Sequence, residues 1–336
     1  MPHPRYSGPV IDAHAHVDGP RFELVQTAMD SNGIDGLVNL WNVELPPPRF
    51  EDWLGEFSQA RNDRMILYHT PDLSRIAEPG FDEFLTEDVT DAAASGASGI
   101  KVWKNLGLHI KDAEERLVPV NDTRLDPLWK AAADAGLPVS IHVADPVAFF
   151  QPLNEYNERY TELSQHPEWW FGGPRFPSFE EIMGQFESLV ARHPETTFVG
   201  VHMGCYAENI EFVGRMLDSY PNYYVDTSAR IGEFGRHGAE KVRDFFVRHA
   251  DRILFGTDIA RTAALWLPEK EYYDRSMRDF YDLHWRYFET DEHGLPNPFP
   301  LQSDWPVDGI SLPDAILEKL YHANALRVIP GLANLP

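Results

Sequence analysis

The chain contains only one cysteine, Cys205, in 336 residues. A single cysteine cannot form a disulfide within the chain, and it excludes a metal site built from thiolates alone. Cys205 matches no motif of a cysteine-dependent enzyme, so we interpret it as a packing residue.

Basic residues are also scarce, with 29 lysines and arginines against 53 aspartates and glutamates and a formal net charge of −24. This charge repels polyanions, so we expect neither a nucleic-acid partner nor binding to an anionic membrane surface. The chain also lacks an apolar signal core near its first residues and an apolar run long enough to span a bilayer. We therefore expect a cytoplasmic protein with a small-molecule partner. Homo-oligomer formation is left open.

The chain does have a repeating alternation of apolar strands and amphipathic helices. Strands are expected at residues 10–16, 36–41, 65–70, 99–103, 137–143, 196–204, 222–231 and 252–258. A helical pattern follows each strand, and the last one covers residues 311–329. Eight strand and helix pairs with apolar strands predict an α/β fold of the (β/α)8 TIM-barrel type. With a 43% hydrophobic composition, one domain over residues 1–336 is expected.

Two long segments interrupt this alternation, at about residues 144–178 and 262–309. The first is rich in aromatic residues, prolines and glycines, and the second contains three tryptophans. Loops of this length usually have a function. Because both segments follow strands, we expect them to cover the active-site face of the barrel.

Polar side chains with metal-binding chemistry lie at the ends of the predicted strands. His14 and His16 are two residues apart in the sequence VIDAHAH, so their imidazoles project from the same face of the strand. The later strands add Lys101, His142, His202 and Asp258. These strand ends share one face of a barrel, and the side chains are therefore expected to converge.

Imidazole nitrogen and carboxylate oxygen suit a divalent metal, with zinc as the first choice and manganese, iron, cobalt, nickel or magnesium as alternatives. Three histidines and one aspartate leave a coordination position for water or substrate. A divalent ion lowers the pKa of bound water from 15.7 to about 7 and polarises a bound carbonyl. Asp258 would then transfer the proton.

This pattern resembles the amidohydrolase superfamily, which carries HxH on strand one, lysine on strand four, histidine on strands five and six, and aspartate on strand eight. The motifs IDAHAH, GVHMG and FGTD are most similar to the amidohydrolase-related group (amidohydrolase 2), which includes metal-dependent decarboxylases and lactonases. The resemblance implies that His14, His16, His142 and Asp258 bind a metal and that Asp258 acts as acid or base. It also implies that His202 is catalytic or binds a second metal.

Lys101 leaves the number of metal ions open at one or two. A buried lysine can pair with a carboxylate, bind a substrate anion or become a bridging carbamate. Superfamily members with this lysine can carboxylate it and bridge two ions, whereas many decarboxylases lack it and hold one.

Further residues near the predicted strand ends are candidates for binding the substrate. An arginine among them could bind a carboxylate through two hydrogen bonds, although exposed ion pairs are the more common role. Tryptophans could line an apolar pocket or only pack a cover. The candidates are Arg230, Arg175, Asp145 and Trp103, together with Asp226 and Arg261.

We predict a metal-dependent hydrolase that acts on a small amide, lactone or ester through a metal-activated water. Asp258 would move the proton and His202 would stabilise the oxyanion. The alternative is non-oxidative decarboxylation of a small aromatic or unsaturated carboxylic acid, with Asp258 or His202 protonating the carbon. A non-catalytic binding protein is the third interpretation, because a fold alone does not establish a function.

Overall fold

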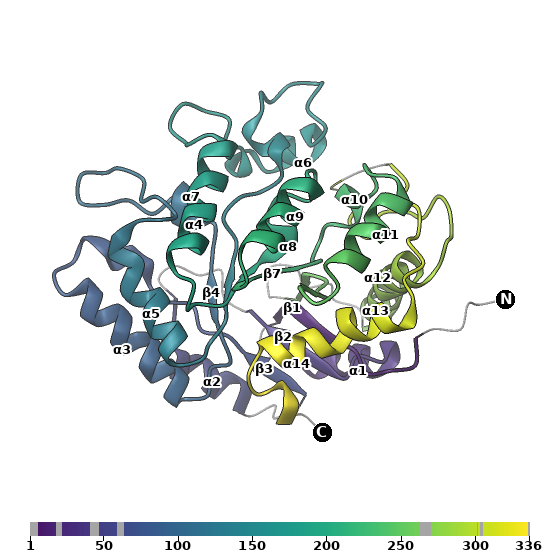
Figure 1. Cartoon of the computed structure of the whole chain (residues 1–336), viewed down its shortest axis with the longest axis horizontal. Helices are drawn as coiled ribbons and strands as arrows, with labels where there is room; N and C mark the ends of the chain where they lie inside the picture. Colours follow the sequence, from purple (N-terminus) through teal and green to yellow (C-terminus); the bar gives the residue numbers. More distant parts are fainter. Residues whose placement is uncertain are drawn as a thin grey trace.

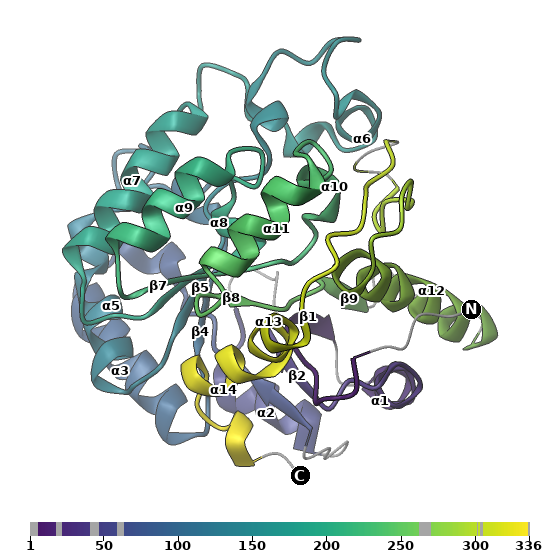
Figure 2. The ribbon, with the colours of Figure 1, turned by 45° about the vertical axis from the view of Figure 1, so that its right-hand side comes forward.

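The computed structural model describes residues 6–17, 22–40, 47–58, 64–261, 270–300, 302 and 305–334. Its strands lie at the centre, and most of the long helices surround them (Figure 1 and Figure 2). The α/β class and the eight predicted strands are confirmed. They are β1 (Ile11–Val17), β2 (Gly36–Asn39), β3 (Met65–Leu67), β4 (Ile100–Val102), β5 (Val139–Ile141), β6 (Phe198–Gly200), β7 (Tyr223–Asp226) and β8 (Ile253–Leu254).

The strands pair in parallel, as a TIM barrel requires. One sheet has the order β3-β2-β1-β9, where β9 (Ile259–Arg261) continues the chain shortly after β8, and the other has the order β4-β5-β6-β7-β8. His69, just after β3, forms a parallel bridge with Ile100 of β4. On the other side, Ala13 N donates to Phe255 O at 2.8 Å. These two links join the sheets into the predicted TIM barrel, with β8 and β9 as two parts of the eighth strand.

The helices after the first seven strands follow the predicted alternation. They are α1 (Phe22–Asn32), α2 (Phe50–Ser58), α3 (Phe81–Ala94), α5 (Asp126–Asp134), α7 (Phe179–Arg192), α9 (Ile210–Ser219) and α11 (Ala239–Arg248). A capping box fixes the start of α7, because Ser178 Oγ accepts from Glu181 N at 3.2 Å and the Glu181 carboxylate accepts from Ser178 N at 2.8 Å. This cap ends the segment 144–178.

Shorter helical elements lie in the connections between strands and helices. The α-helical turns are α4 (Asn105–Leu108), α6 (Tyr160–Gln165), α8 (Val201–Gly204) and α10 (Ile231–Phe234). The 3-10 turns are η2 (Leu73–Ala77), η3 (Thr123–Leu125), η4 (Val147–Phe150), η5 (Pro167–Trp169) and η8 (Leu332–Asn334). Three of them, η4, α6 and η5, lie within residues 144–178, so this segment is partly helical.

The segment after strand eight differs from the prediction. Helix α12 (Lys270–Glu289) lies inside the range 262–309 and packs against α1, where the eighth outer helix of a barrel belongs. Its buried residues Met277, Tyr281, Trp285 and Phe288 recur at intervals of three or four and form an apolar face. Residues 262–269, which include Trp266, lie outside the described residues.

Residues 311–329, predicted as the eighth outer helix, have another role. They contain α13 (Asp314–Glu318), a π-helical turn η7 (Lys319–Ala323) and α14 (Asn324–Val328). The Asn324 amide donates to the carbonyls of Ala250 and Ile253, each at 2.7 Å, beside the start of β8. Ala325, Ile329 and Leu332 pack in one cluster with Ile11, Val38 and Ile66. The carboxyl-terminal segment therefore covers the end of the barrel at which the strands begin.

An irregularity in β1 determines which of its residues face the barrel interior. The register between β1 and β2 shifts between Asp12 and Ala15. Ile11 and Ala13, in the first half of β1, belong to the cluster that contains Ala325, Ile329 and Leu332. A bulge changes the side-chain alternation by one residue, so His14 and His16 also face the interior.

The membrane prediction can be compared with the helices. Among the residues placed by the structure, no helix combines the length and the apolar composition needed to cross a membrane.

His284 on α12 predicts a pH dependence of stability. Its ring packs on Phe280, and Nδ1 donates to Phe280 O at 2.8 Å. Burial lowers the pKa of His284 from 6.5 to about 4, so as the pH falls the unfolded chain takes up the proton first. This residue should remove about 2 kcal/mol of stability between pH 7.5 and pH 5. We expect His284→Gln to lose correspondingly less stability over that range, measured by urea denaturation at both pH values.

The matched control for this experiment is His322→Gln, at a partly exposed position. It should keep the wild-type difference between the two pH values. A His284→Gln protein with the full wild-type loss would contradict the prediction.

Candidate metal centre and adjoining cavity

His14, His16 and Asp258 bring three potential ligand atoms together. His14 Nε2 lies 3.2 Å from His16 Nε2 and 3.3 Å from Asp258 Oδ1, and His16 Nε2 lies 3.2 Å from the same oxygen. We call these three atoms the ligand triangle. Two donors held tetrahedrally at about 2.1 Å by one zinc ion lie about 3.4 Å apart, close to the sides of this triangle. The spacing therefore fits a single metal ion.

The charge states of two members of the triangle, His16 and Asp258, also fit a cation. For His14, burial lowers the pKa, but Asp226 raises it above its usual value. Burial lowers the pKa of His16 to about 4, although Asp258 raises it in part, so this imidazole is neutral at pH 7. Burial raises the pKa of Asp258, but the adjoining His14 and His16 hold it well below its usual value. A neutral imidazole and an ionised carboxylate are the states that coordinate a metal.

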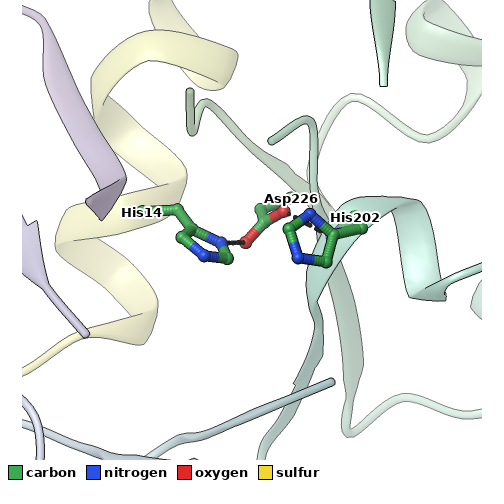
Figure 3. A group of neighbouring side chains, drawn as sticks. All are labelled: His14, His202 and Asp226. Carbon is green, nitrogen blue, oxygen red and sulfur yellow. Dashed lines mark hydrogen bonds and ion pairs between the residues drawn. The ribbon is translucent and has the colours of Figure 1, made fainter. Parts of the chain in front are cut away.

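Asp226 at the end of β7 orients His14. Its Oδ2 lies 2.8 Å from His14 Nδ1, and its Oδ1 accepts from His202 N at 2.8 Å and from Ser228 Oγ at 2.5 Å. Figure 3 shows Asp226 between the two imidazoles. The carboxylate keeps the His14 proton on Nδ1, so the Nε2 lone pair is free for the ligand triangle. Asp226 was a candidate for binding substrate, and in the structure it contacts the two histidines instead.

His202 lies beside the triangle, in a turn that ends β6 earlier than predicted. The backbone enters the left-handed region at His202, Met203 and Cys205, with φ of 56°, 56° and 62°. Such strained backbone is often found at functional sites. His202 Nδ1 donates to Ser228 O at 2.9 Å, which leaves Nε2 as an acceptor. Its ring centre lies 5.0 Å from that of His14 and 4.5 Å from that of His142.

His142 does not join the ligand triangle. Its Nε2 lies 3.2 Å from Ala144 O and 3.4 Å from Asp145 Oδ1, so the loop after β5 holds this nitrogen. The predicted convergence of four ligands is therefore seen for His14, His16 and Asp258 only. Metal binding by His142 remains a prediction.

Lys101 is fully buried, and its Nζ has no hydrogen-bond partner among the described residues. The nitrogen lies 4.8 Å from the centre of the Trp103 ring, and this ring lies 5.0 Å from that of His16. Burial lowers the pKa of Lys101 to about 8, against the opposite effect of Asp226 and Asp258. Part of Lys101 is therefore uncharged near neutral pH, which is the form that carboxylation requires.

A cavity of about 220 Å³ adjoins the triangle. His142, His202 and Asp258 line it from the strand ends, and Trp169 and Gln302 reach it from the segments 144–178 and 262–309. Both long segments therefore contribute to the same cavity. Its other lining residues are Lys104, Asp145, Pro146, Phe149, Arg159, Glu162 and Arg230.

Several cavity residues carry no signal in the sequence. Lys104 forms an ion pair with Asp145, and Arg159 forms ion pairs with Glu162 and with Glu233 of α10. Arg159 and Glu162 lie in the segment 144–178, where no motif marks them, and only the fold brings them to the strand ends. A basic residue next to a predicted strand end was the only available signal for Lys104.

The candidate substrate contacts lie in three different places. Arg230 and Asp145 line the cavity, whereas Trp103 contacts His16 beside the ligand triangle. Arg175 lies elsewhere, because its guanidinium stacks 4.7 Å from the centre of Phe176 and lines a separate groove with residues 107–119. The side chain of Arg261 lies outside the described residues.

Comparison with solved structures shows similarity of fold. The chain resembles 2,6-dihydroxybenzoate decarboxylase from Rhizobium, with 16% identity, a TM-score of 0.51 and coverage of 95% of this chain and 98% of that one. It also resembles 5-carboxyvanillate decarboxylase from Novosphingobium aromaticivorans, solved with manganese, with 14% identity, a TM-score of 0.52 and 96% coverage of each chain. The 4-oxalomesaconate hydratase from Rhodopseudomonas palustris is 15% identical, with a TM-score of 0.52 and 96% coverage of each chain.

Sequence comparison gives the family assignment. No curated protein matches the chain. The model of the amidohydrolase family matches residues 11–331, which include the ligand triangle, His202 and the carboxyl-terminal cover. This chain therefore belongs to the amidohydrolase family, a family of metal-dependent enzymes.

Proposed function

We propose that this protein is a metal-dependent decarboxylase of a small aromatic or unsaturated carboxylic acid. The observation that carries the proposal is the position of Asp258. Its carboxylate belongs to the ligand triangle, its side chain is 26% exposed, and it lines the same cavity as His202, Phe149 and Trp169. A candidate proton-transfer group, which is also a candidate metal ligand, and two aromatic side chains therefore line one small cavity. Aromatic side chains favour a flat, unsaturated ligand.

His14, His16 and Asp258 would hold the metal, with Lys101, His142 and His202 as the remaining candidates. When bound, a divalent ion supplies positive charge that orients and polarises the reacting carboxylate. The donor set suits zinc, and 5-carboxyvanillate decarboxylase, which has a similar fold, was solved with manganese. The activity test should therefore use protein loaded with zinc and protein loaded with manganese.

Side chains of this protein, Asp258 and His202, would transfer the proton. In decarboxylation the bond between the ring carbon and the carboxyl group breaks, CO2 leaves, and the electron pair stays on the carbon. That carbon must then receive a proton. Asp258, which is ionised before the reaction, would take this proton up from solvent and deliver it, and His202 offers a second site because its Nε2 is an acceptor in this structure. Phe149 and Trp169 would restrict the position of the ring.

Hydrolysis, the first choice from the sequence, is the second candidate. Lys101 favours it, since a carboxylated lysine can bridge two metals in this superfamily, and His14, His202 and Asp226 form a second group of potential ligands. In this reaction Asp258 would accept a proton from the attacking water and return it to the leaving group. We rank decarboxylation first because Phe149 and Trp169 in the cavity wall support a flat, unsaturated ligand.

The two reactions can be separated with one substrate panel. Protein loaded with zinc or manganese would be incubated with hydroxybenzoic acids, unsaturated acids and lactones. We expect CO2 release from at least one acid, detected together with the change in ultraviolet absorbance, and loss of the activity on chelation of the metal.

Lactone opening without CO2 release would support hydrolysis instead. A fully metal-loaded protein that binds acids but converts no compound of the panel would support the third interpretation, a binding protein.

A further inference from the structure

The charged residues of the cavity are not evenly matched. Its cations are Lys104, Arg159 and Arg230. Lys104 is neutralised by Asp145, and Arg159 by Glu162 at 2.9 Å and by Glu233. Arg230 forms no direct ion pair with any carboxylate of the described residues, although Glu233 and Glu208 lie close enough to raise its pKa against the opposite effect of burial. Arg230 is therefore the one cation lining the cavity, within that part of the chain, that lacks a direct ion-pair partner.

Arg230 is also buried, with 5% of its surface exposed. Its Nη1 donates to the Ala229 carbonyl at 2.7 Å, which fixes the guanidinium but does not neutralise it. A buried, unpaired charge is costly for a folded protein. An anion that enters the cavity would remove that cost, and a carboxylate matches the planar guanidinium with two hydrogen bonds.

Two other polar atoms in the cavity wall lack partners within the described residues. They are Arg159 Nε and Gln302 Oε1. Arg159 is 2% exposed, and Gln302 reaches the cavity from the segment 262–309. Buried polar atoms without partners need an explanation, and a polar ligand supplies one. A donor and an acceptor would then be available around the group that Arg230 binds.

We propose that the substrate carries a second acidic group, in addition to the group that reacts at the metal centre, and that Arg230 binds it. This inference rests on the proposed function only for the reacting group. One unpaired cation balances one negative charge, and Glu162 and Asp145 in the same wall disfavour a doubly charged phosphate. The substrate class is therefore a small carboxylic acid with a second carboxylate.

The proposal can be tested with inert aromatic acids. Binding to the metal-loaded protein would be measured by calorimetry for benzoate, isophthalate, terephthalate and 3-carbamoylbenzoate. We expect at least one dicarboxylate to bind about 10-fold or more tightly than benzoate, because a hydrogen-bonded charge pair contributes that much. The neutral amide in 3-carbamoylbenzoate should give no such gain. This comparison needs no substitution in the protein.

Substitutions then assign the effect to Arg230. In Arg230→Met the advantage of the dicarboxylate should disappear, and Arg230→Lys should restore part of it. The control is Arg248→Met, which removes an exposed arginine paired with Asp218 outside the cavity and should keep the full advantage. Near-equal binding of benzoate and both dicarboxylates in the wild type would overturn the proposal. An advantage that survives in a folded Arg230→Met protein would do the same.

The binding test of Arg230 and the activity test for decarboxylation can fail separately. A dicarboxylate preference that depends on Arg230, without turnover of any acid, would support the binding site and reject decarboxylation. CO2 release without that preference would support decarboxylation and reject the role of Arg230.

Discussion

Asp258→Asn protein is expected to lose at least about 100-fold of its turnover while it still binds metal. The amide oxygen of asparagine keeps the shape of the side chain and can coordinate an ion, but it cannot accept and return a proton. General acid and base catalysis contributes about 10²- to 10⁴-fold, and the loss should fall in this range. The position of Asp258 in both the ligand triangle and the cavity is the structural basis of this expectation.

Metal content and turnover must be measured on the same Asp258→Asn sample. The contrasting variant is His16→Ala, which removes a corner of the ligand triangle and should lose metal and activity together. Near-normal turnover in fully loaded Asp258→Asn protein would reject proton transfer by Asp258 and leave His202 as the candidate.

Asp226→Asn is expected to bind metal about 10- to 100-fold more weakly, although Asp226 is outside the ligand triangle. The carboxylate fixes the proton of His14 on Nδ1 and makes Nε2 a stronger ligand, and a neutral amide does this poorly. Partners that orient a metal-bound histidine typically have effects of this size. The measurement is competition for zinc against a chromophoric chelator.

The control for this experiment is Asp72→Asn, at an exposed carboxylate that caps η2 by accepting from Ser74 N at 3.1 Å. It should leave metal affinity unchanged. An Asp226→Asn protein that unfolds like the wild type and binds zinc with wild-type affinity would show that Asp226 does not control His14.

The strands could be predicted because a parallel barrel buries both faces of each strand, which makes every strand a short apolar run. Helix α12 could not be found in the same way. Its buried face consists largely of aromatic residues with polar atoms, such as Tyr281 and Trp285, and it follows a long segment without a clear period. For residues 311–329 the opposite holds. Their helical pattern is predicted correctly, but their position beneath the barrel depends on tertiary packing, which the pattern does not contain.

For the candidate site, the sequence predicts which residues lie at strand ends and not how they contact one another. His14, His16 and Asp258 come together because strands one and eight are neighbours in a closed barrel. The loop that holds the His142 nitrogen and the left-handed turn at His202 depend on local backbone geometry that no periodicity encodes. The pairing of Arg159 with Glu233, 74 residues apart, is a long-range contact that only the fold reveals.

The cover formed by residues 311–329 has a consequence for synthesis on the ribosome. Ile11 and Ala13 are translated long before Ala325, Ile329 and Leu332, the residues with which they share their cluster. The interior of the barrel therefore cannot be sealed until Leu332 has left the exit tunnel. During that time the nascent strands expose apolar surface, the condition in which chaperones bind a growing chain. A polypeptide interrupted shortly before Asn324 would contain every residue of the metal centre and still lack the contacts that close the barrel around it.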